Sequence, residues 1–368
     1  MTSPENRFDI PLNIAEVLGH FRTSGSPVRA RRFGSGHIHT TWLIESADKA
    51  EPAGSGEFSG MGGPDYILQQ FNNSVFPLTA ATMENILLVT GHLRRKWDAG
   101  SGCVVPELIE TTTGGLFHTD ALGNPWRMYR RIVPGISYDV VPDVPVAREA
   151  GSIFGKFIAD LSDFAPEKLT VVIPGFHSAE LRYHQLQEAI RNDASGRRNE
   201  VEAEIRFAEL NSDAMMELPR RQASGEIPVR VTHNDTKLNN VLFDEQNRAV
   251  SVIDLDTVMP GLSLYDFGDL VRTAAGTGNE DEADLSRIGF SRSLYDAIRE
   301  GFLEQAGHLL TPAEIALLPL SARYMTWIMG IRFLADYLNG DVYYKTHYQG
   351  QNLRRCRAQF RLMETMDI

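Results

Sequence analysis

The sequence predicts an α+β protein of two lobes, in which a small antiparallel sheet with one main helix precedes a larger, mostly helical part. Three observations support this fold class. The chain has 368 residues, which is more than one hydrophobic core usually supports. Its first third is patterned as short strands around one helix, and its remainder shows mainly the apolar spacing of amphipathic helices. We expect a cleft between the lobes, because small ligands commonly bind in such clefts.

The first lobe is predicted from alternating strand and turn signals. Residues 28–33 and 40–45 are predicted to form a hairpin, because β-branched and aromatic residues surround a glycine-containing turn. Residues 46–64 carry five glycines together with serines and prolines, so a long exposed loop is expected there. The further expected elements are a third strand at 66–71, a helix at about 78–97, and strands around 103–109 and 126–132.

The boundary between the lobes is predicted at Pro134 and Gly135, which interrupt the strand pattern. Residues 1–133 then form the first lobe, and residues 134–368 form the second. The expected elements of the second lobe are an amphipathic helix around 153–161, two exposed helices within 180–221, and two short strands at 229–232 and 250–253.

Charge and cysteine content exclude several classes of protein. The formal net charge is -12, from 36 Lys plus Arg against 48 Asp plus Glu, which opposes binding to nucleic acid or to an anionic membrane. The sequence shows no signal peptide and no run of about 18 apolar residues, so we expect a cytoplasmic protein that does not enter a membrane. Cys103 and Cys356 are expected to be reduced and to lie in different lobes. Nothing in the sequence indicates an obligate protein partner.

The chemistry is predicted to lie in two polar clusters that follow short apolar runs. The first cluster carries His233, Asp235 and Asn240. Phosphoryl transfer needs a base near the acceptor hydroxyl and oxygen ligands for magnesium, and an Asp followed five residues later by an Asn supplies both. The second cluster brings Asp254 and Asp256 to the same edge of a predicted hairpin. One carboxylate at a strand end is usually a turn former, but two such clusters indicate a site.

The pattern His-x-Asp-x-x-x-x-Asn followed by Ile-Asp-Leu-Asp resembles the catalytic and metal-binding loops of the aminoglycoside phosphotransferase and choline kinase superfamily. This resemblance implies a protein-kinase-like fold. The chain further resembles the N-acetylhexosamine 1-kinases, which phosphorylate the anomeric hydroxyl of N-acetylglucosamine or N-acetylgalactosamine. The segments that carry this second resemblance are 34–41, 66–70, 231–240, 253–261 and 332–341.

The resemblance implies a role for each residue of the two clusters. Asp235 is the catalytic base, which orients the hydroxyl and accepts its proton late, and His233 braces the loop. Asn240 and Asp254 are the Mg²⁺ ligands. Asp256 either ligates the metal or holds the sugar, and the second role is favoured. Lys237 either neutralises phosphate charge or is solvated.

Binding of ATP is expected at a glycine turn and at the third strand. The turn would let backbone N–H groups approach the phosphates without obstruction by side chains. Gln69 stands where many members of the superfamily carry a basic residue that holds the phosphates, and the hexosamine kinases also have Gln there. Glu84 is the available acidic residue on the following helix. The turn residues are Gly34, Ser35 and Gly36.

Adenine is expected to bond to backbone groups of the segment that connects the lobes, Arg130, Arg131 and Ile132, while the two arginine side chains face solvent. For the acceptor, the resemblance implies that Arg332 and Tyr343 contact the sugar. The alternative for Arg332 is a surface ion pair with a carboxylate one helical turn away, Asp336. Asp266 and Asp269 are expected to cap and brace the helix that follows them.

We therefore expect an ATP- and Mg²⁺-dependent kinase that phosphorylates the anomeric hydroxyl of an N-acetylhexosamine. Kinases for choline, homoserine, aminoglycosides or another sugar are the alternatives within this class, because an acidic lobe would suit a cationic acceptor. A nucleotide-binding pseudokinase is the alternative outside it. Gln69 favours the pseudokinase, and the joint presence of Asp235, Asn240 and Asp254 opposes it.

Overall fold

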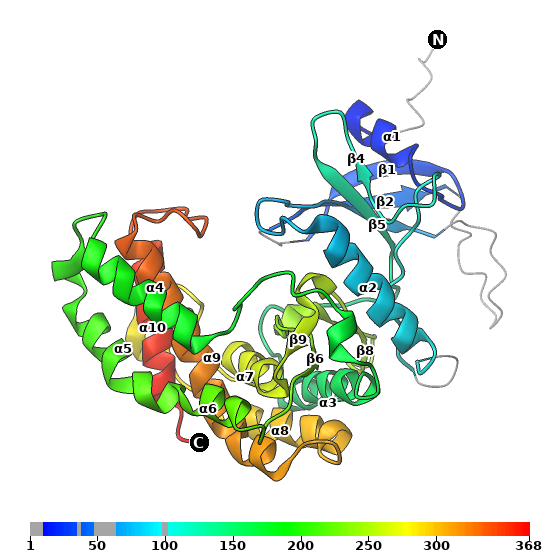
Figure 1. Cartoon of the computed structure of the whole chain (residues 1–368). Helices are drawn as coiled ribbons and strands as arrows, with labels where there is room; N and C mark the ends of the chain where they lie inside the picture. Colours follow the sequence, from blue (N-terminus) through cyan, green and yellow to red (C-terminus); the bar gives the residue numbers. More distant parts are fainter. Residues whose placement is uncertain (1–9, 35–37, 48–63, 98–101) are drawn as a thin grey trace. The chain divides into compact units, whose positions relative to one another are not determined.

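The computed structural model describes residues 10–34, 38–47, 64–97 and 102–368 (Figure 1). The chain divides into two compact units, Met1–Pro134 and Gly135–Ile368. Cys103 lies in the first unit and Cys356 in the second, and both are free thiols. No helix within the described ranges is long and apolar enough to cross a membrane.

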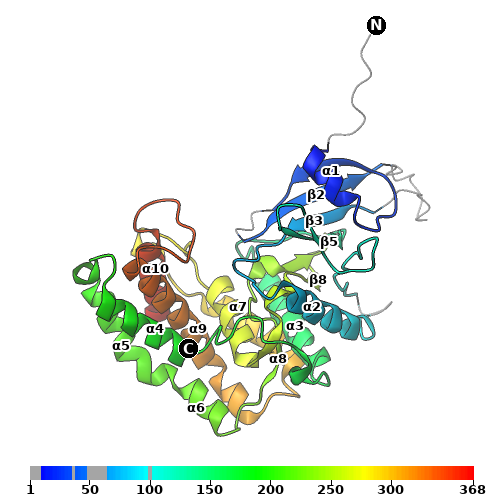
Figure 2. The ribbon, with the colours of Figure 1, turned by 45° about the horizontal axis from the view of Figure 1, so that its top comes forward.

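The first unit is built on a five-stranded antiparallel sheet of order β1-β2-β3-β5-β4. Helix α1 covers one face of this sheet with Ile14 and Val17, and α2 lies on the opposite side (Figure 2). Side chains alternate between the two faces, so that Leu68 packs under α1 while its neighbour Gln69 points away. The elements are α1 (Leu12–Leu18), β1 (Pro27–Arg32), β2 (Thr40–Ser46), β3 (Tyr66–Gln70), α2 (Thr79–Arg94), β4 (His118–Thr119) and β5 (Pro125–Arg130).

The structure differs from the expected first lobe in three places. Residues 103–109 form no regular strand and make one isolated bridge, between Leu108 and Tyr129. Pro106 lies in this segment and has no N–H to donate to a ladder, which explains the interruption. Helix α1 and the short strand β4 were not predicted. Most of the expected loop at 46–64 lies outside the described residues.

The second unit is mostly helical and contains two small antiparallel sheets, β6 with β9 and β7 with β8. The segment 180–221 holds parts of three helices rather than two. The elements are α3 (Val144–Asp160), η1 (Pro166–Lys168), α4 (Ala179–Asn192), η2 (Arg198–Glu200), α5 (Glu202–Met215), α6 (Glu217–Ala223), β6 (Arg230–Thr232), η3 (Leu238–Asn240), β7 (Val241–Phe243), β8 (Ala249–Val252), η4 (Leu255–Thr257), β9 (Met259–Gly261), α7 (Ser263–Ala274), η5 (Leu285–Arg287), α8 (Arg292–Ala306), α9 (Pro312–Leu338) and α10 (Gln351–Thr365).

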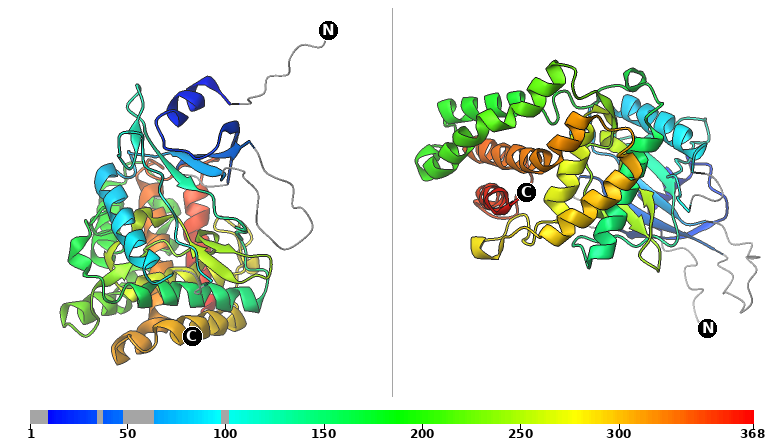
Figure 3. Two further views of the ribbon diagram at one scale, coloured as in Figure 1. Left: turned by 90° about the vertical axis from the view of Figure 1, so that its right-hand side faces the viewer. Right: turned by 90° about the horizontal axis from the view of Figure 1, so that it is seen from below.

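Helices α3 and α8 pack unusually closely, and the two run side by side in Figure 3. Gly155 of α3 faces α8, where a Cβ added to it would lie 2.5 Å from the carbonyl oxygen of Phe302. Gly151 and Gly301 are in the same situation, with a backbone carbonyl closer than 3.0 Å to the added atom. Backbone atoms cannot move aside as a flexible side chain can, so the crossing requires glycine.

We expect Gly155→Ala to lower the free energy of unfolding by about 2 kcal/mol, the usual cost of overpacking a close contact. The control is Gly91→Ala on α2, where an added Cβ meets nothing within 4 Å. That change should raise stability by about 0.8 kcal/mol, because alanine is the better helix former. Urea unfolding of both variants measures the difference. Equal effects of the two substitutions would contradict the close-packing account.

Candidate active site

The predicted catalytic loop joins β6 to β7 and contains a residue with a left-handed backbone. Asn234 has φ 64°, a conformation that asparagine tolerates better than most residues. Its side-chain amide donates to the carbonyl oxygens of Thr232 (3.2 Å) and Thr257 (3.0 Å), which fixes the turn. The next residue along the loop is Asp235, whose side chain is partly buried.

A buried carboxylate from α7 holds the backbone of this loop. Asp266 Oδ2 accepts the N–H of His233 (2.8 Å), and Oδ1 accepts the N–H of Asn234 (2.7 Å). Burial raises the pKa of Asp266 to about 7, despite these two donors. The expectation that Asp266 caps its own helix is wrong, because the N-cap residue of α7 is Leu262 and the carboxylate is used by the loop.

The other acidic residue of that segment, Asp269, pairs with a cation of the same helix. Its Oδ1 lies 2.8 Å from Arg272 Nη2, and both side chains are 4% exposed. Asp269 therefore braces α7 internally, as expected, and does not cap it.

His233 connects the loop to the strand that carries the second polar cluster. Its Nδ1 accepts the backbone N–H of Asp235 (3.2 Å), so Nε2 must carry the proton that is donated to the carbonyl oxygen of Ile253 (2.9 Å). Burial lowers the pKa of His233 and keeps the ring neutral. The ring packs edge-on against two phenylalanines of α3, Phe154 and Phe157. This is the geometry of a residue that braces the loop.

Asp235 forms an ion pair with Lys237, whose Nζ lies 2.8 Å from Asp235 Oδ1. Burial alone would raise the pKa of Asp235, but the adjacent ammonium group outweighs it and lowers this pKa. The same pair raises the pKa of Lys237. The carboxylate is therefore ionised at neutral pH. Neither sequence-based alternative for Lys237, a phosphate contact or a solvated side chain, described this pairing.

The β7–β8 hairpin brings the second polar cluster to the loop. Val241 pairs with Val252, and Ile253 N–H donates to Asn240 O (2.9 Å), which sets Asp254 beside the end of the loop. Asn240 directs its amide nitrogen at the carbonyl oxygen of Asp235 (2.8 Å), so its side-chain oxygen points elsewhere. Asp254 has φ 60°, a left-handed turn that ends β8.

The carboxylates of Asp254 and Asp256 lie close together, with one oxygen of each within 4.8 Å of the other. Asp254 is exposed, whereas Asp256 is 2% exposed. Hard oxygen donors at this separation suit Mg²⁺, which prefers carboxylate ligands and keeps several waters. The two carboxylates therefore fit a magnesium ion, and Asn240 lies next to them along the hairpin, where its backbone carbonyl accepts the N–H of Ile253.

A histidine outside the loop also holds it. His177 Nε2 donates to the carbonyl oxygen of Asn234 (2.8 Å). Burial lowers the pKa of His177 to about 4, so the ring is neutral at physiological pH. The Nδ1 atom is buried and has no hydrogen-bond partner among the described residues. This contact could not be predicted from local sequence patterns, because 57 residues separate the two partners.

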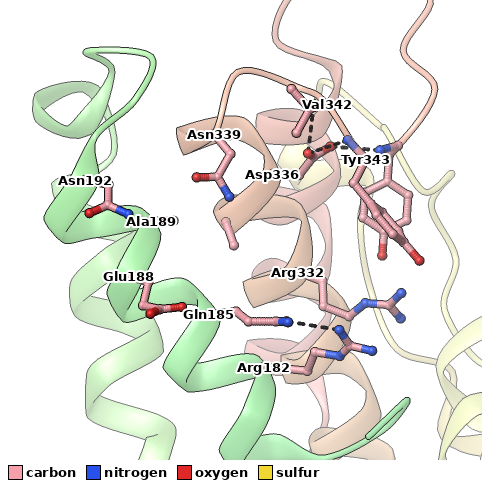
Figure 4. Close-up of a pocket in the computed structure, with 12 residues that line it drawn as sticks. Arg182, Gln185, Glu188, Ala189, Asn192, Arg332, Asp336, Asn339, Val342 and Tyr343 are labelled. Atoms are coloured by element: carbon pink, nitrogen blue, oxygen red, sulfur yellow. Dashed lines mark hydrogen bonds between the residues drawn. The ribbon is translucent and has the colours of Figure 1, made fainter. Parts of the chain in front are cut away.

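The two predicted acceptor residues line a pocket of about 390 Å³ between α4 and α9 (Figure 4). Arg332 lies at the α9 side, and Tyr343 lies in the segment after α9, with its side chain largely exposed. The alternative that Arg332 pairs with Asp336 is not what the structure shows. The Asp336 carboxylate instead accepts N–H groups, which belong to Val342, Tyr343, Tyr344 and Asn352.

Two further residues of this pocket escaped the sequence analysis. Arg182 of α4 is held by Phe176 O (3.0 Å) and Gln185 Oε1 (3.0 Å), and burial followed by the charge of Arg332 lowers its pKa. The hydroxyl of Tyr344 is buried and, in the part of the chain that the structure describes, has no hydrogen-bond partner. An unsatisfied buried hydroxyl in a pocket is a candidate contact for a ligand.

The predicted nucleotide-binding residues all belong to the first unit. Gly34 has φ 77°, which glycine adopts without strain, while Ser35 and Gly36 lie outside the described residues. Gln69 Oε1 accepts from Arg127 Nε (2.9 Å), a buried arginine of β5 that the sequence analysis did not consider. Glu84 is exposed on α2, so its side chain points away from the buried face of that helix.

Two backbone N–H groups of the expected adenine-binding segment are already hydrogen-bonded within the first unit. Arg130 N–H donates to Glu107 O and Arg131 N–H to Asp65 O, both at 2.9 Å. The side chain of Arg130 also forms an ion pair with Glu107, and that of Arg131 forms one with Asp65. Ile132 follows the end of β5, and its backbone stays the predicted adenine contact.

The chain is similar to known proteins both in sequence and in fold. A profile described as the phosphotransferase enzyme family matches residues 29–308. The structure is similar to that of a microcompartment-associated aminopropanol kinase, with a TM-score of 0.64 and 18% identity over 95% of this chain and 94% of that one. It is also similar to an aminoglycoside phosphotransferase from Alicyclobacillus acidocaldarius, with a TM-score of 0.57 and 13% identity over 99% of this chain and 98% of that one. For an ethanolamine kinase from Plasmodium vivax, the TM-score is 0.55 and the identity is 12%, over 90% of this chain and 82% of that one. These likenesses confirm the predicted α+β, protein-kinase-like fold.

The buried His177 makes stability depend on pH in a defined window. Its pKa is about 4 in the folded chain and near 6.5 when unfolded, so unfolding takes up a proton below pH 6.5. The contribution of His177 to the free energy of unfolding should therefore fall as the pH falls from 6.5 toward 4, by at most about 1.4 kcal/mol per pH unit, whereas the raised pKa of Asp266 contributes with the opposite sign. His177→Gln should lose this part of the pH dependence, measured by urea unfolding at several pH values. His184→Gln, at an exposed site of α4, is the control and should keep it. An unchanged pH dependence in His177→Gln would disprove the assignment.

Proposed function

Because the chain belongs to the phosphotransferase enzyme family, we propose that it transfers the γ-phosphoryl group of ATP to the anomeric hydroxyl of N-acetylglucosamine or N-acetylgalactosamine. The observation that carries this proposal is the ionised Asp235, held in a braced loop beside the donors Asn240 and Asp254. An ionised carboxylate next to hard metal ligands is the arrangement that phosphoryl transfer to a hydroxyl needs. ATP is proposed as the donor, and this is supported by a solved amicoumacin kinase of similar fold, 13% identical, that is in complex with AMP-PNP.

Asp235 is the proposed base. Its carboxylate would accept a hydrogen bond from the acceptor hydroxyl and take the proton as the new P–O bond forms. The low pKa suits this role, because alignment of the hydroxyl contributes more than basicity in a loose transition state. His233 and Asp266 do not reach the acceptor in this proposal. They hold the backbone on either side of the base in place.

Asn240, Asp254 and Asp256 are the proposed magnesium ligands. The short distance between the two carboxylates favours metal binding for Asp256 over the sugar contact that the sequence suggested. The ion would neutralise charge on the phosphates when bound. Asn240 Nδ2 also bonds to the Asp235 carbonyl, so this side chain would link the position of the metal to that of the base.

The pocket of Arg332 supports a neutral, carbonyl-bearing acceptor over an amine. The guanidinium groups of Arg182 and Arg332 both line it. Of the two carboxylates among its described lining residues, that of Asp336 is already bonded to N–H groups, and that of Glu188 lies 3.6 Å from the imidazole of His184. Two neighbouring arginines disfavour a cationic ligand and can donate to sugar hydroxyls or to an acetamide oxygen. The aminopropanol and ethanolamine kinases of similar fold are named for amine substrates. The overall negative charge is therefore a poor guide to the acceptor.

We expect Asp235→Asn to reduce kcat by roughly 10³-fold, the usual contribution of a positioned general base. ATP binding, measured by calorimetry, should be retained, because the amide has the same shape. ADP release is followed with a panel of N-acetylhexosamines, hexoses, choline and aminoglycosides. The control is Asp213→Asn, at a site 86% exposed on α5, which should leave kcat unchanged. Full turnover in Asp235→Asn would remove the assignment, and ATP binding without turnover on any acceptor would favour a pseudokinase.

Arg332→Lys should raise KM for the acceptor about tenfold and leave KM for ATP unchanged, because lysine keeps the charge but loses the planar pair of donors. Steady-state kinetics with each substrate varied separately test this. Arg361→Lys on α10 is the matched control, where an exposed arginine pairs with Glu364 (3.1 Å). An unchanged acceptor KM in Arg332→Lys would show that the acceptor binds elsewhere.

A further inference from the structure

One face of the first unit's sheet carries a row of polar side chains across three strands. Thr41 of β2 is the register partner of Gln69 of β3, which is in turn the partner of Arg127 of β5. Gln69 Nε2 donates to Thr41 Oγ1 (3.2 Å), and Gln69 Oε1 accepts from Arg127 Nε (2.9 Å). The side chains therefore form one hydrogen-bonded line on the face opposite α1.

Aromatic rings flank the guanidinium of Arg127. Its central carbon lies 4.9 Å from the ring centroid of Phe71 and 5.2 Å from that of Tyr129. The side chain is 1% exposed, so it is held in one orientation in a medium of low dielectric. The bond to Gln69 uses the Nε donor alone, and a guanidinium carries four more N–H donors on its two terminal nitrogens.

We propose that Arg127 binds the α- and β-phosphates of the nucleotide, with Gln69 as a positioning residue that fixes the guanidinium plane. The third strand has glutamine where a basic residue would hold these phosphates, and the cation is supplied from the next strand at the same register position. When the nucleotide binds, its phosphate oxygens would replace the contacts that the two terminal nitrogens of Arg127 make in its absence. A guanidinium group can form two parallel hydrogen bonds with a phosphate. This inference rests on the proposed function, since it requires that the chain binds ATP.

The test measures binding of adenosine, AMP, ADP and ATP by calorimetry to the full chain and to Arg127→Gln. Wild-type affinity should rise with the number of phosphates. In Arg127→Gln the affinity for ADP and ATP should fall roughly 10- to 100-fold, the loss expected for a bidentate charged contact, while that for adenosine stays unchanged. Arg22→Gln is the matched control, because it removes an arginine of the same unit whose partner is the exposed Glu110 (2.9 Å). That control should bind every nucleotide as the wild type does.

A second variant keeps the inference testable if Arg127→Gln does not fold, as judged by circular dichroism. Gln69→Arg with Arg127→Gln restores a guanidinium one strand across the same register pair, and this variant should again bind ADP and ATP more tightly than adenosine. Equal loss of adenosine and ATP binding in a folded variant, or no loss at all, would overturn the role of Arg127. Failure of the wild type to bind ATP would instead overturn the proposed function.

Discussion

The position of the candidate catalytic loop depends on one buried carboxylate. Asp266 accepts two consecutive N–H groups, those of His233 and Asn234, and this pair of bonds sets the direction in which the chain leaves β6. The left-handed conformation of Asn234 follows immediately and turns Asp235 out of the strand direction. Without an acceptor for both N–H groups, two buried donors would be unsatisfied at a cost of several kcal/mol. The proposed base, Asp235, is thus positioned by a carboxylate of α7, a helix that lies about 30 residues further along the chain.

The second unit uses opposite charges in two places for two purposes. Acidic and amide oxygens gather where the β7–β8 hairpin ends, beside the loop, and they are the proposed donors for a cation. Guanidinium groups gather between α4 and α9, where the carboxylate of Asp336 is taken up by backbone N–H groups of the following segment. The net charge of -12 is a sum over the whole chain, so it does not indicate the local charge of the acidic cluster or of the arginine-lined pocket. Local bonding of each carboxylate decides which ligand a pocket can accept.

The loop and its hairpin could be predicted from the sequence because their signals are local. An apolar run ends in a polar cluster within a few residues, as before Asp235 and Asp254. The supporting residues could not be predicted, because their contacts join distant parts of the chain: 33 residues separate Asp266 from His233, and 58 separate Arg127 from Gln69. Side-chain alternation along β5 places Arg127 and Gln69 on one face only once the register is known. The strand expected around 103–109 does not form, for a local reason: Pro106 has no N–H group to donate to a neighbouring strand.

Helix α9 contacts both the strand that leads into the loop and the pocket, and it does so as one continuous helix with an internal proline, Pro319. Near its first turn Glu314 forms a buried, two-pronged ion pair with Arg230 of β6, the strand that leads into the loop. Arg332 follows 18 residues later, roughly 27 Å along the helix axis at the usual rise per residue. The spacing between the loop strand and the pocket is therefore set by the length of one helix, and an insertion or deletion within α9 would also rotate the pocket-lining side chains by about 100° per residue. Under the proposed function, substitutions around the pocket would change acceptor preference alone, whereas any change in the length of α9 would alter distance and orientation together.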